Sequence, residues 1–248
     1  MVDIRQPDDE VKTYDVVEVD LPLGAEDPIR TVVVTDAAGT VEVMAFRRSD
    51  GSVAARIRAR GPGRAVVMVA DTPVAEVVVD GSTASPAPLS RNARMFAAGP
   101  RMTTDGGDPF LWIGDTWWLG LSGRLADDEF TRLASFRAGQ GYSVVQLVAG
   151  LYPDVDWRDD LVTVSGFAPF DDELHPDPHW FDRADRRVRA LVRAGIVPCV
   201  FGLWAYHVGF VGIDAAMRLW REIIARWSAL PVIWTVAGEA SLPWYGRL

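Results

Sequence analysis

Residues 231–239, PVIWTVAGE, form a short apolar run that ends in a glycine followed by Glu239. A continuous apolar run of this length predicts a strand that is buried on both faces, as the strands of parallel sheets are. Three similar runs precede it in the chain: PFLWIG at 109–114, YSVVQLVAG at 142–150 and IVPCVFGLW at 196–204. The sequence therefore predicts four strands of one parallel sheet.

A helix is predicted between each pair of strands, because residues 126–141, 179–195 and 212–229 carry apolar side chains at helical spacing. The order β-α-β-α-β-α-β begins both a doubly wound sheet and a (β/α)8 barrel. Polar and aromatic residues collect after each strand, which favours the barrel, whose active sites are built from these loops. No GxGxxG or GxxxxGK[ST] loop follows any strand, which argues against a nucleotide-binding protein.

The first third of the chain has a different hydrophobic pattern. In residues 13–80, apolar and polar residues alternate with period two between turns such as DAAG, RSDG and GPG. Six strands are predicted: 14–21, 30–36, 40–46, 52–59, 63–70 and 74–80. Short strands at this spacing indicate an antiparallel β-sandwich. The predicted organisation is an N-terminal tail (1–12), a β-sandwich (13–80), a Pro/Ser-rich linker (81–92) and a partial barrel domain (93–248).

The predicted fold class is therefore mixed, an N-terminal antiparallel β-sandwich followed by the first half of a (β/α)8 TIM barrel. A whole barrel takes about 250 residues, and 93–248 has room for only four strand–helix units. We therefore expect the sequence to be truncated. Half a barrel would expose two sheet edges, and exposed edges promote association between chains. Self-association of half-barrels through these edges is the alternative to truncation.

The composition excludes several classes of partner. The net charge is −9, and no basic stripe with interleaved aromatic residues is present, so we expect no nucleic acid. No signal peptide is visible in the N-terminal residues as written, and no apolar run approaches the ~18 residues of a membrane span. As written, the chain is expected to be cytoplasmic and not membrane-bound; a missing upstream start would make it extracellular or periplasmic.

Glu239 is the main catalytic candidate, because a carboxylate at the end of a barrel strand is placed to act on a ligand. Retaining glycosidases use two such groups, one as general acid/base and one as nucleophile. Burial among aromatic side chains such as Trp204 and Trp234 would suit a proton donor. Spacing alone leaves a helix N-terminal carboxylate or a surface ion pair equally open for Glu239.

Other polar and aromatic residues are candidates for substrate binding. Tryptophans just beyond strand ends are suited to stack on a sugar ring; these are Trp117, Trp204 and Trp244. Asp115 could cap a helix or hold sugar hydroxyl groups, and His207, alone in a loop, is expected to face solvent. Cys199 lies in an apolar run and is expected to be a buried, inert thiol.

No cofactor or metal site is predicted. His175 and His179 lie four residues apart, but Pro176 and Pro178 prevent the helical face that a zinc pair would use.

Residues 105–148, DGGDPFLWIGDTWWLGLSGRLADDEFTRLASFRAGQGYSVVQLV, resemble the opening of the apiosidase-like glycoside hydrolase domain. That family begins with G-x-P-F-x-x-x-G-D-T-x-W and continues with R-x-x-x-G-(F/Y)-x-x-(V/I)-Q. Residues 175–204 and 231–239 are similar to its later elements, and the N-terminal part is similar to the β-sandwich that often precedes it.

The resemblance implies a (β/α)8 barrel that hydrolyses glycosidic bonds in polysaccharide side chains, apiosyl linkages in the characterised branch. By position, it implies that Glu239 is the acid/base of a retaining reaction. It also implies that Asp115, Trp117, Gln146 and Trp204 line the pocket, and that the nucleophile lies on a later strand absent from this chain. The bulky Trp118 and the long loop 150–178 depart from the family pattern and would reshape the pocket.

The leading hypothesis is an N-terminal fragment of a glycoside hydrolase that binds carbohydrate, needs no cofactor and is inactive alone. A non-catalytic carbohydrate-binding or assembly protein is the alternative. A lyase or aldolase is a third reading, but the only lysine, Lys12, is far from any barrel strand end, which argues against Schiff-base chemistry.

Overall fold

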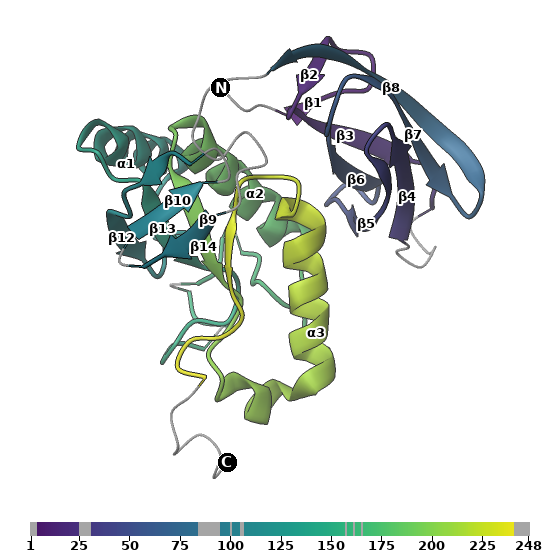
Figure 1. Ribbon diagram of the computed structural model, residues 1–248. Coiled ribbons are helices and arrows are strands. Elements are labelled where there is room, and N and C mark those ends of the chain that lie inside the picture. Colours follow the sequence, from purple (N-terminus) through teal and green to yellow (C-terminus); the bar gives the residue numbers. More distant parts are fainter. Residues whose placement is uncertain are drawn as a thin grey trace. The chain divides into compact units, whose positions relative to one another are not determined.

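The computed structural model describes residues 4–24, 31–83, 95–99, 101–104, 107–156, 158–160, 162–164 and 166–240 (Figure 1). The chain separates into two compact units. One comprises Met1–Trp112 with Ala225–Pro231, and the other comprises Ile113–Ile224 with Val232–Leu248. Within the described ranges, no helix has the length and apolar character needed to cross a membrane.

The first unit is built on one eight-stranded sheet in the order β1-β3-β6-β5-β4-β7-β8-β2. In chain order its strands are β1 (Ile4–Arg5), β2 (Val11–Thr13), β3 (Val16–Leu21), β4 (Thr31–Asp36), β5 (Gly39–Arg47), β6 (Val53–Arg58), β7 (Gly63–Val69) and β8 (Thr72–Thr83). Neighbours pair antiparallel except for β1 with β3 and β2 with β8, which pair parallel. All six predicted strands are confirmed.

The predicted two-sheet sandwich is not what the structure shows, because β5 joins its two halves. Residues 39–44 of β5 pair with β4, and residues 45–47 pair with β6. The sheet thus passes from one side of the core to the other within a single strand and becomes nearly closed and barrel-like. Strands β2 to β8 all contribute buried side chains to one shared core.

Segments outside the predicted sandwich also belong to this unit. Strand β1 and the first two residues of β2 lie in the expected tail, and residues 81–83 of the expected linker end β8. Residues 84–92 lie outside the described residues. A three-stranded antiparallel sheet follows, made of β9 (Met95–Ala98), β10 (Arg101–Thr104) and β11 (Pro109–Phe110). The domain boundaries themselves stay predictions.

The second unit is a four-stranded parallel sheet whose strands follow one another in chain order. The strands are β12 (Gly114–Trp117), β13 (Val144–Val148), β14 (Val197–Phe201) and β15 (Ile233–Thr235), and the helices are α1 (Asp127–Gly139), α2 (Pro178–Arg193) and α3 (His207–Trp227). The predicted alternation of strands and helices and the parallel pairing are confirmed.

The helix starts follow from local sequence. The Glu129 side chain accepts a hydrogen bond from the Ala126 N–H at 2.9 Å, and Asp177 accepts one from the His179 N–H at 2.7 Å. Both contacts satisfy backbone donors that a helix N-terminus leaves unpaired. Gly212, at φ 79°, interrupts α3, so its long part begins where the sequence predicts, after a first turn at His207.

The first predicted strand of this sheet is wrong by several residues. The run 109–114 is divided, because Phe110 pairs with Met102 in the three-stranded sheet while β12 begins only at Gly114. The Asp-Thr-Trp segment at 115–117, expected to follow a strand, is therefore the strand itself. This shift decides which of its side chains face the candidate site.

Candidate active site

The parallel sheet has two chemically different faces. Asp115 and Trp117 lie on one face, and Thr116 lies on the other with Gln146, to which its hydroxyl donates a hydrogen bond at 3.1 Å. We call these the Asp115 face and the Gln146 face. The Gln146 face is defined by Thr116, Trp118, Gln146, Cys199, Phe201 and Thr235.

The Asp115 face packs against helices. Arg137 of α1 donates to the Asp115 carboxylate at 2.7 Å, and the Trp117 indole N–H donates to it at 2.9 Å. The Trp117 ring meets the buried Phe130 of α1 edge-on at 5.2 Å. Burial alone would raise the pKa of Asp115, but the hydrogen bonds from Trp117 and the Thr116 N–H and the charge of Arg137 outweigh it and lower this pKa.

The Gln146 face carries a row of polar side chains across all four strands. Thr116, Gln146 and Cys199 lie opposite one another in the strand register. Gln146 also hydrogen-bonds the Cys199 thiol, whose sulfur lies 3.5 Å from the Thr235 hydroxyl. A row of amide, hydroxyl and thiol groups is unlike the apolar interior of a purely structural sheet, and it offers several hydrogen-bonding positions.

An aromatic cluster lies next to this row at the carboxyl ends of the strands. Trp118 meets Phe201 and Trp204 edge-on at 5.7 and 5.1 Å, and Phe201 and Trp204 lie 5.7 Å apart with their planes 23° from parallel. Trp204 is buried, whereas Trp118 is 38% exposed. Aromatic surface beside polar groups is the combination that binds sugar rings, whose faces are apolar and whose edges carry hydroxyl groups.

Glu239 is joined to this cluster through Gly238. Gly238 donates to the Leu203 carbonyl and accepts from the Ala205 N–H, both at 3.0 Å, so the end of β15 is held alongside Trp204. Glu239 itself is exposed and has φ 55°, a left-handed conformation that is uncommon for residues other than glycine. Backbone strain of this kind clusters at functional sites.

The expected burial of Glu239 between Trp204 and Trp234 is not found. The ring of Trp234 lies 6.3 Å from that of Trp220 in α3, on the Asp115 face. Only Trp204 of the two belongs with Glu239.

His207 is half-buried rather than facing solvent as expected. The Trp204 N–H donates to its Nδ1 at 3.0 Å, and a second hydrogen bond links the ring to the Tyr152 backbone. Burial lowers the pKa of His207 to about 4, although the Tyr152 hydrogen bond and the charge of Asp154 act in the opposite direction. The neutral ring thus ties the loop after β13 to the loop that carries Trp204.

Arg187 of α2 organises the loop between Trp118 and α1. Its side chain is 1% exposed and donates to the carbonyls of Gly120 and Ser122 at 2.6 and 2.7 Å, to the Leu125 carbonyl and to the Asp127 carboxylate. A buried guanidinium needs this number of acceptors, since an unpaired buried charge is strongly destabilising. The position of Trp118 therefore depends on α2 as well as on its own strand.

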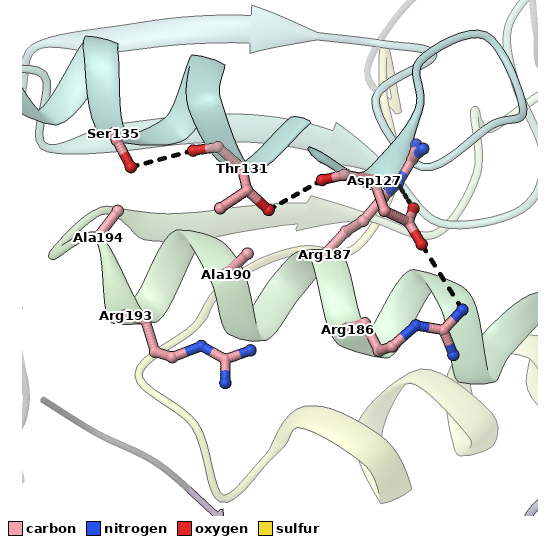
Figure 2. Close-up of a pocket in the computed structure, with 8 residues that line it drawn as sticks. All are labelled: Asp127, Thr131, Ser135, Arg186, Arg187, Ala190, Arg193 and Ala194. Carbon is pink, nitrogen blue, oxygen red and sulfur yellow. Dashed lines mark hydrogen bonds and ion pairs between the residues drawn. The ribbon is translucent and has the colours of Figure 1, made fainter. Parts of the chain in front are cut away.

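A groove of about 400 Å³ lies between α1 and α2, and Figure 2 shows the side chains that line it. The hydroxyls of Thr131 and Ser135 donate to backbone carbonyls of their own helix, and Arg186 lies 3.7 Å from Asp127. Burial would raise the pKa of Asp127, but hydrogen bonds from Arg183 and Arg187 hold it below its usual value. These groups serve helix packing, away from the strand ends.

Of the predicted site residues, Trp204 contacts both His207 and Gly238, the residue before Glu239. Gln146 lies on the face of the sheet that carries Phe201, whose ring stacks on Trp204. Asp115 and Trp117 lie on the opposite face, and Trp244 lies outside the described residues. Substrate binding by all of these residues stays a prediction. Sequence reasoning did not choose Thr116, Phe201 or Thr235, and it named Trp118 only as a departure from the family pattern. Thr116 and Trp118 follow from the alternation of side chains along β12, and Phe201 and Thr235 follow from the same alternation along β14 and β15.

The described residues contain no group of three or more His, Cys, Asp or Glu side chains that could hold a metal ion. Nδ1 of His175 instead lies 3.2 Å from the Asp171 carboxylate, and the His179 ring stacks on the Phe167 ring with 4.1 Å between their centres.

Comparison with known proteins shows the family to which this chain belongs. A family model described as "Apiosidase-like, catalytic domain" matches residues 98–245. A "putative glycoside hydrolase" from Bacteroides vulgatus ATCC 8482 has the same fold, with a TM-score of 0.70 and 17% identity over 96% of this chain and 52% of that one. A glycoside hydrolase family 5 structure from the same organism has a TM-score of 0.49 and 19% identity, over 59% of this chain and 32% of that one.

This chain spans about half the length of the first of these structures. No curated protein sequence matches it.

Proposed function

The chain belongs to the family of apiosidase-like catalytic domains, and from this premise we propose that it is part of a glycoside hydrolase. In this proposal the Gln146 face binds the sugar and Glu239 is the proton donor. The observation that carries it is the position of Glu239, directly after a glycine whose backbone lies against Trp204 of the aromatic cluster.

We also propose that the four strand–helix units are the first half of a (β/α)8 barrel, with the Gln146 face inside. The parallel order of β12 to β15 and the helix contacts on the Asp115 face support this arrangement. The eight-stranded sheet would then be the accessory β-domain that precedes the barrel. A retaining reaction needs a second carboxylate about 5–5.5 Å from the first, and we assign it to one of the four other barrel units.

The proposed chemistry divides between these groups. Trp118 and Trp204 offer ring surface to the apolar side of a sugar, and Thr116 and Gln146 offer hydrogen bonds to its hydroxyl groups. Glu239 protonates the oxygen of the leaving group as the second carboxylate attacks the anomeric carbon and the glycosidic bond breaks. Glu239, now ionised, then takes a proton from the water that attacks the glycosyl-enzyme and releases the second carboxylate. Glycosides from polysaccharide side chains, with apiosyl linkages among them, are the proposed substrates.

The test compares two lengths of protein. A protein that carries the full barrel should hydrolyse aryl glycosides, Glu239→Gln should lower kcat by about 10²–10⁴-fold, and the 248-residue chain should show no turnover. Full activity of the Glu239→Gln protein would remove Glu239 from the mechanism. Turnover by the 248-residue chain, lost on Glu239→Gln, would show that the second carboxylate lies within it.

A further inference from the structure

We infer that the Gln146 amide is oriented to bind two adjacent hydroxyl groups of an uncharged sugar. This inference rests on the proposed function and adds a substrate class to it. The orientation comes from the neighbours of Gln146 on both sides in the strand register, Thr116 on β12 and Cys199 on β14.

The two ends of the amide are distinguished by these neighbours. The Thr116 hydroxyl donates to Oε1 of Gln146 at 3.1 Å, which places Nε2 on the side of Cys199. A hydrogen bond from Gln146 lowers the pKa of the Cys199 thiol against the larger effect of burial, as a donor to sulfur does. The Thr235 hydroxyl, 3.5 Å from the same sulfur, continues the row to β15.

An amide has more hydrogen-bonding capacity than the row uses. Its oxygen accepts two hydrogen bonds and its nitrogen donates two. With one of each engaged along the row, one acceptor and one donor are left, and Gln146 is only half-buried. An amide with one free donor and one free acceptor can form two hydrogen bonds to neighbouring groups of a ligand, as Asn and Gln do with adenine.

A pair of adjacent hydroxyl groups matches such an edge, because one hydroxyl can donate to Oε1 while the next accepts from Nε2. The aromatic cluster beside the row suits the apolar face of the same ring. All six residues that define the Gln146 face are uncharged, so the face offers no cation to a phosphate or a uronate carboxylate. An uncharged sugar with a vicinal diol is the ligand class that fits.

The decisive experiment is a binding cycle that changes the protein and the sugar together. Methyl glycosides of neutral pentoses and hexoses, as pyranosides and furanosides, are titrated into the 248-residue chain by tryptophan fluorescence. The tightest binder is then compared with its monodeoxy analogues in the unmodified chain, in Gln146→Leu and in Gln140→Leu. Gln140 directly follows α1 and accepts a hydrogen bond from Arg137, so it is the matched control.

We expect removal of either of two adjacent hydroxyls to weaken binding to the unmodified chain and to Gln140→Leu by about tenfold, the effect of one hydrogen bond. In Gln146→Leu the same removals should change binding less than twofold, because such coupling reports direct contact. Discrimination that persists in Gln146→Leu overturns the inference and leaves the proposed function standing. Absence of binding by every glycoside overturns the inference, and turnover by the protein with the full barrel then decides whether the proposed function stands.

Two further variants keep the test decisive if Gln146→Leu does not fold. Gln146→Glu keeps the shape and the acceptor but removes the donor, so it should lose discrimination at one hydroxyl only. Cys199→Ala should lower discrimination at that hydroxyl, and Cys199→Ser, which keeps a partner for Nε2, should restore it. Equal discrimination in all variants would mean that the row only stabilises the sheet.

Discussion

The backbone of Gly238 lies against the indole ring of Trp204, so closely that a Cβ atom at Gly238 would lie 2.5 Å from the ring. No neighbouring atom can stay in place at that distance, and Trp204 is itself packed by Trp118 and Phe201. Glycine is therefore required at this position for a steric reason, and the residue that it positions is Glu239.

Gly238→Ala should displace either Trp204 or the Glu239 backbone and cost about 1–3 kcal/mol of unfolding free energy, as overpacking does. Urea denaturation measures the cost, and near-ultraviolet circular dichroism reports the tryptophan environment. Gly209→Ala is the control, because nothing lies within 4 Å of a Cβ atom there. Equal stability of the two variants would show that the Trp204 contact is not tight.

The backbone conformation of Glu239 should carry a stability cost. Its φ of 55° suits glycine better than any residue with a side chain, so Glu239→Gly should be more stable than Glu239→Gln by about 1 kcal/mol. Both variants should lower kcat by about 10²–10⁴-fold in a protein with the full barrel. Thermal unfolding of the pair checks the prediction, which fails if Glu239→Gln is the more stable.

The two faces of β12 predict opposite effects for neighbouring residues. Asp115→Asn removes the charge that Arg137 and Trp117 share and should cost about 1–2 kcal/mol with little change in sugar affinity. Thr116→Val, on the other face, should weaken sugar binding by about tenfold with little change in stability. Denaturation and fluorescence titration of both variants separate these outcomes, and the reverse pattern would place the substrate on the Asp115 face.

Arg187 should matter for stability far more than its neighbour Arg186, whose side chain is 60% exposed. Arg187→Met removes the donor that the Asp127 carboxylate shares with the carbonyls of the Trp118–α1 loop. It should lower the free energy of unfolding by about 3–5 kcal/mol. Arg186→Met should change stability by less than about 0.5 kcal/mol. Similar denaturation midpoints for the two variants would contradict the role of Arg187 in holding the Trp118 loop.

His207 should make stability depend on pH in a defined window. Its pKa is 6.5 as an ordinary side chain and about 4 in the fold, so between these values the unfolded chain binds a proton that the folded chain does not. Stability is therefore kept above about pH 6.5 and falls as the pH drops towards 4, by at most about 1.4 kcal/mol per unit.

His207→Asn, which keeps an acceptor for the Trp204 N–H, should remove this part of the slope, as measured by urea denaturation from pH 4.5 to 8. Identical slopes in the unmodified protein and in His207→Asn would contradict the lowered pKa.

Most elements were predictable because their patterns are local. The six strands of residues 14–80 follow from alternation between turns, and the parallel strands follow from apolar runs separated by helical periods. The closure of the eight-stranded sheet was not predictable in this way. It depends on β5, whose residues 39–44 pair with β4 and whose residues 45–47 pair with β6. The hydrophobic pattern of a strand does not show which strands it pairs with.

The candidate site shows a different limit. Glu239, Gln146 and Trp204 were found because they lie at or near strand ends or match a motif. Asp115 and Trp117 were chosen from the family resemblance and because they were expected to lie just beyond a strand that ends at residue 114. Side chains alternate along a strand, so an error in where β12 lies exchanges one face for the other.

Cys199 is the only cysteine of the chain, it is 2% exposed, and burial raises the pKa of its thiol. A thiol reagent can reach it only when β14 separates from its neighbours, so the labelling rate under native conditions reports the free energy of that opening. A sugar bound on the Gln146 face would slow this reaction in proportion to its occupancy. The Cys199 labelling rate of the unmodified protein therefore measures both local opening of the sheet and ligand binding.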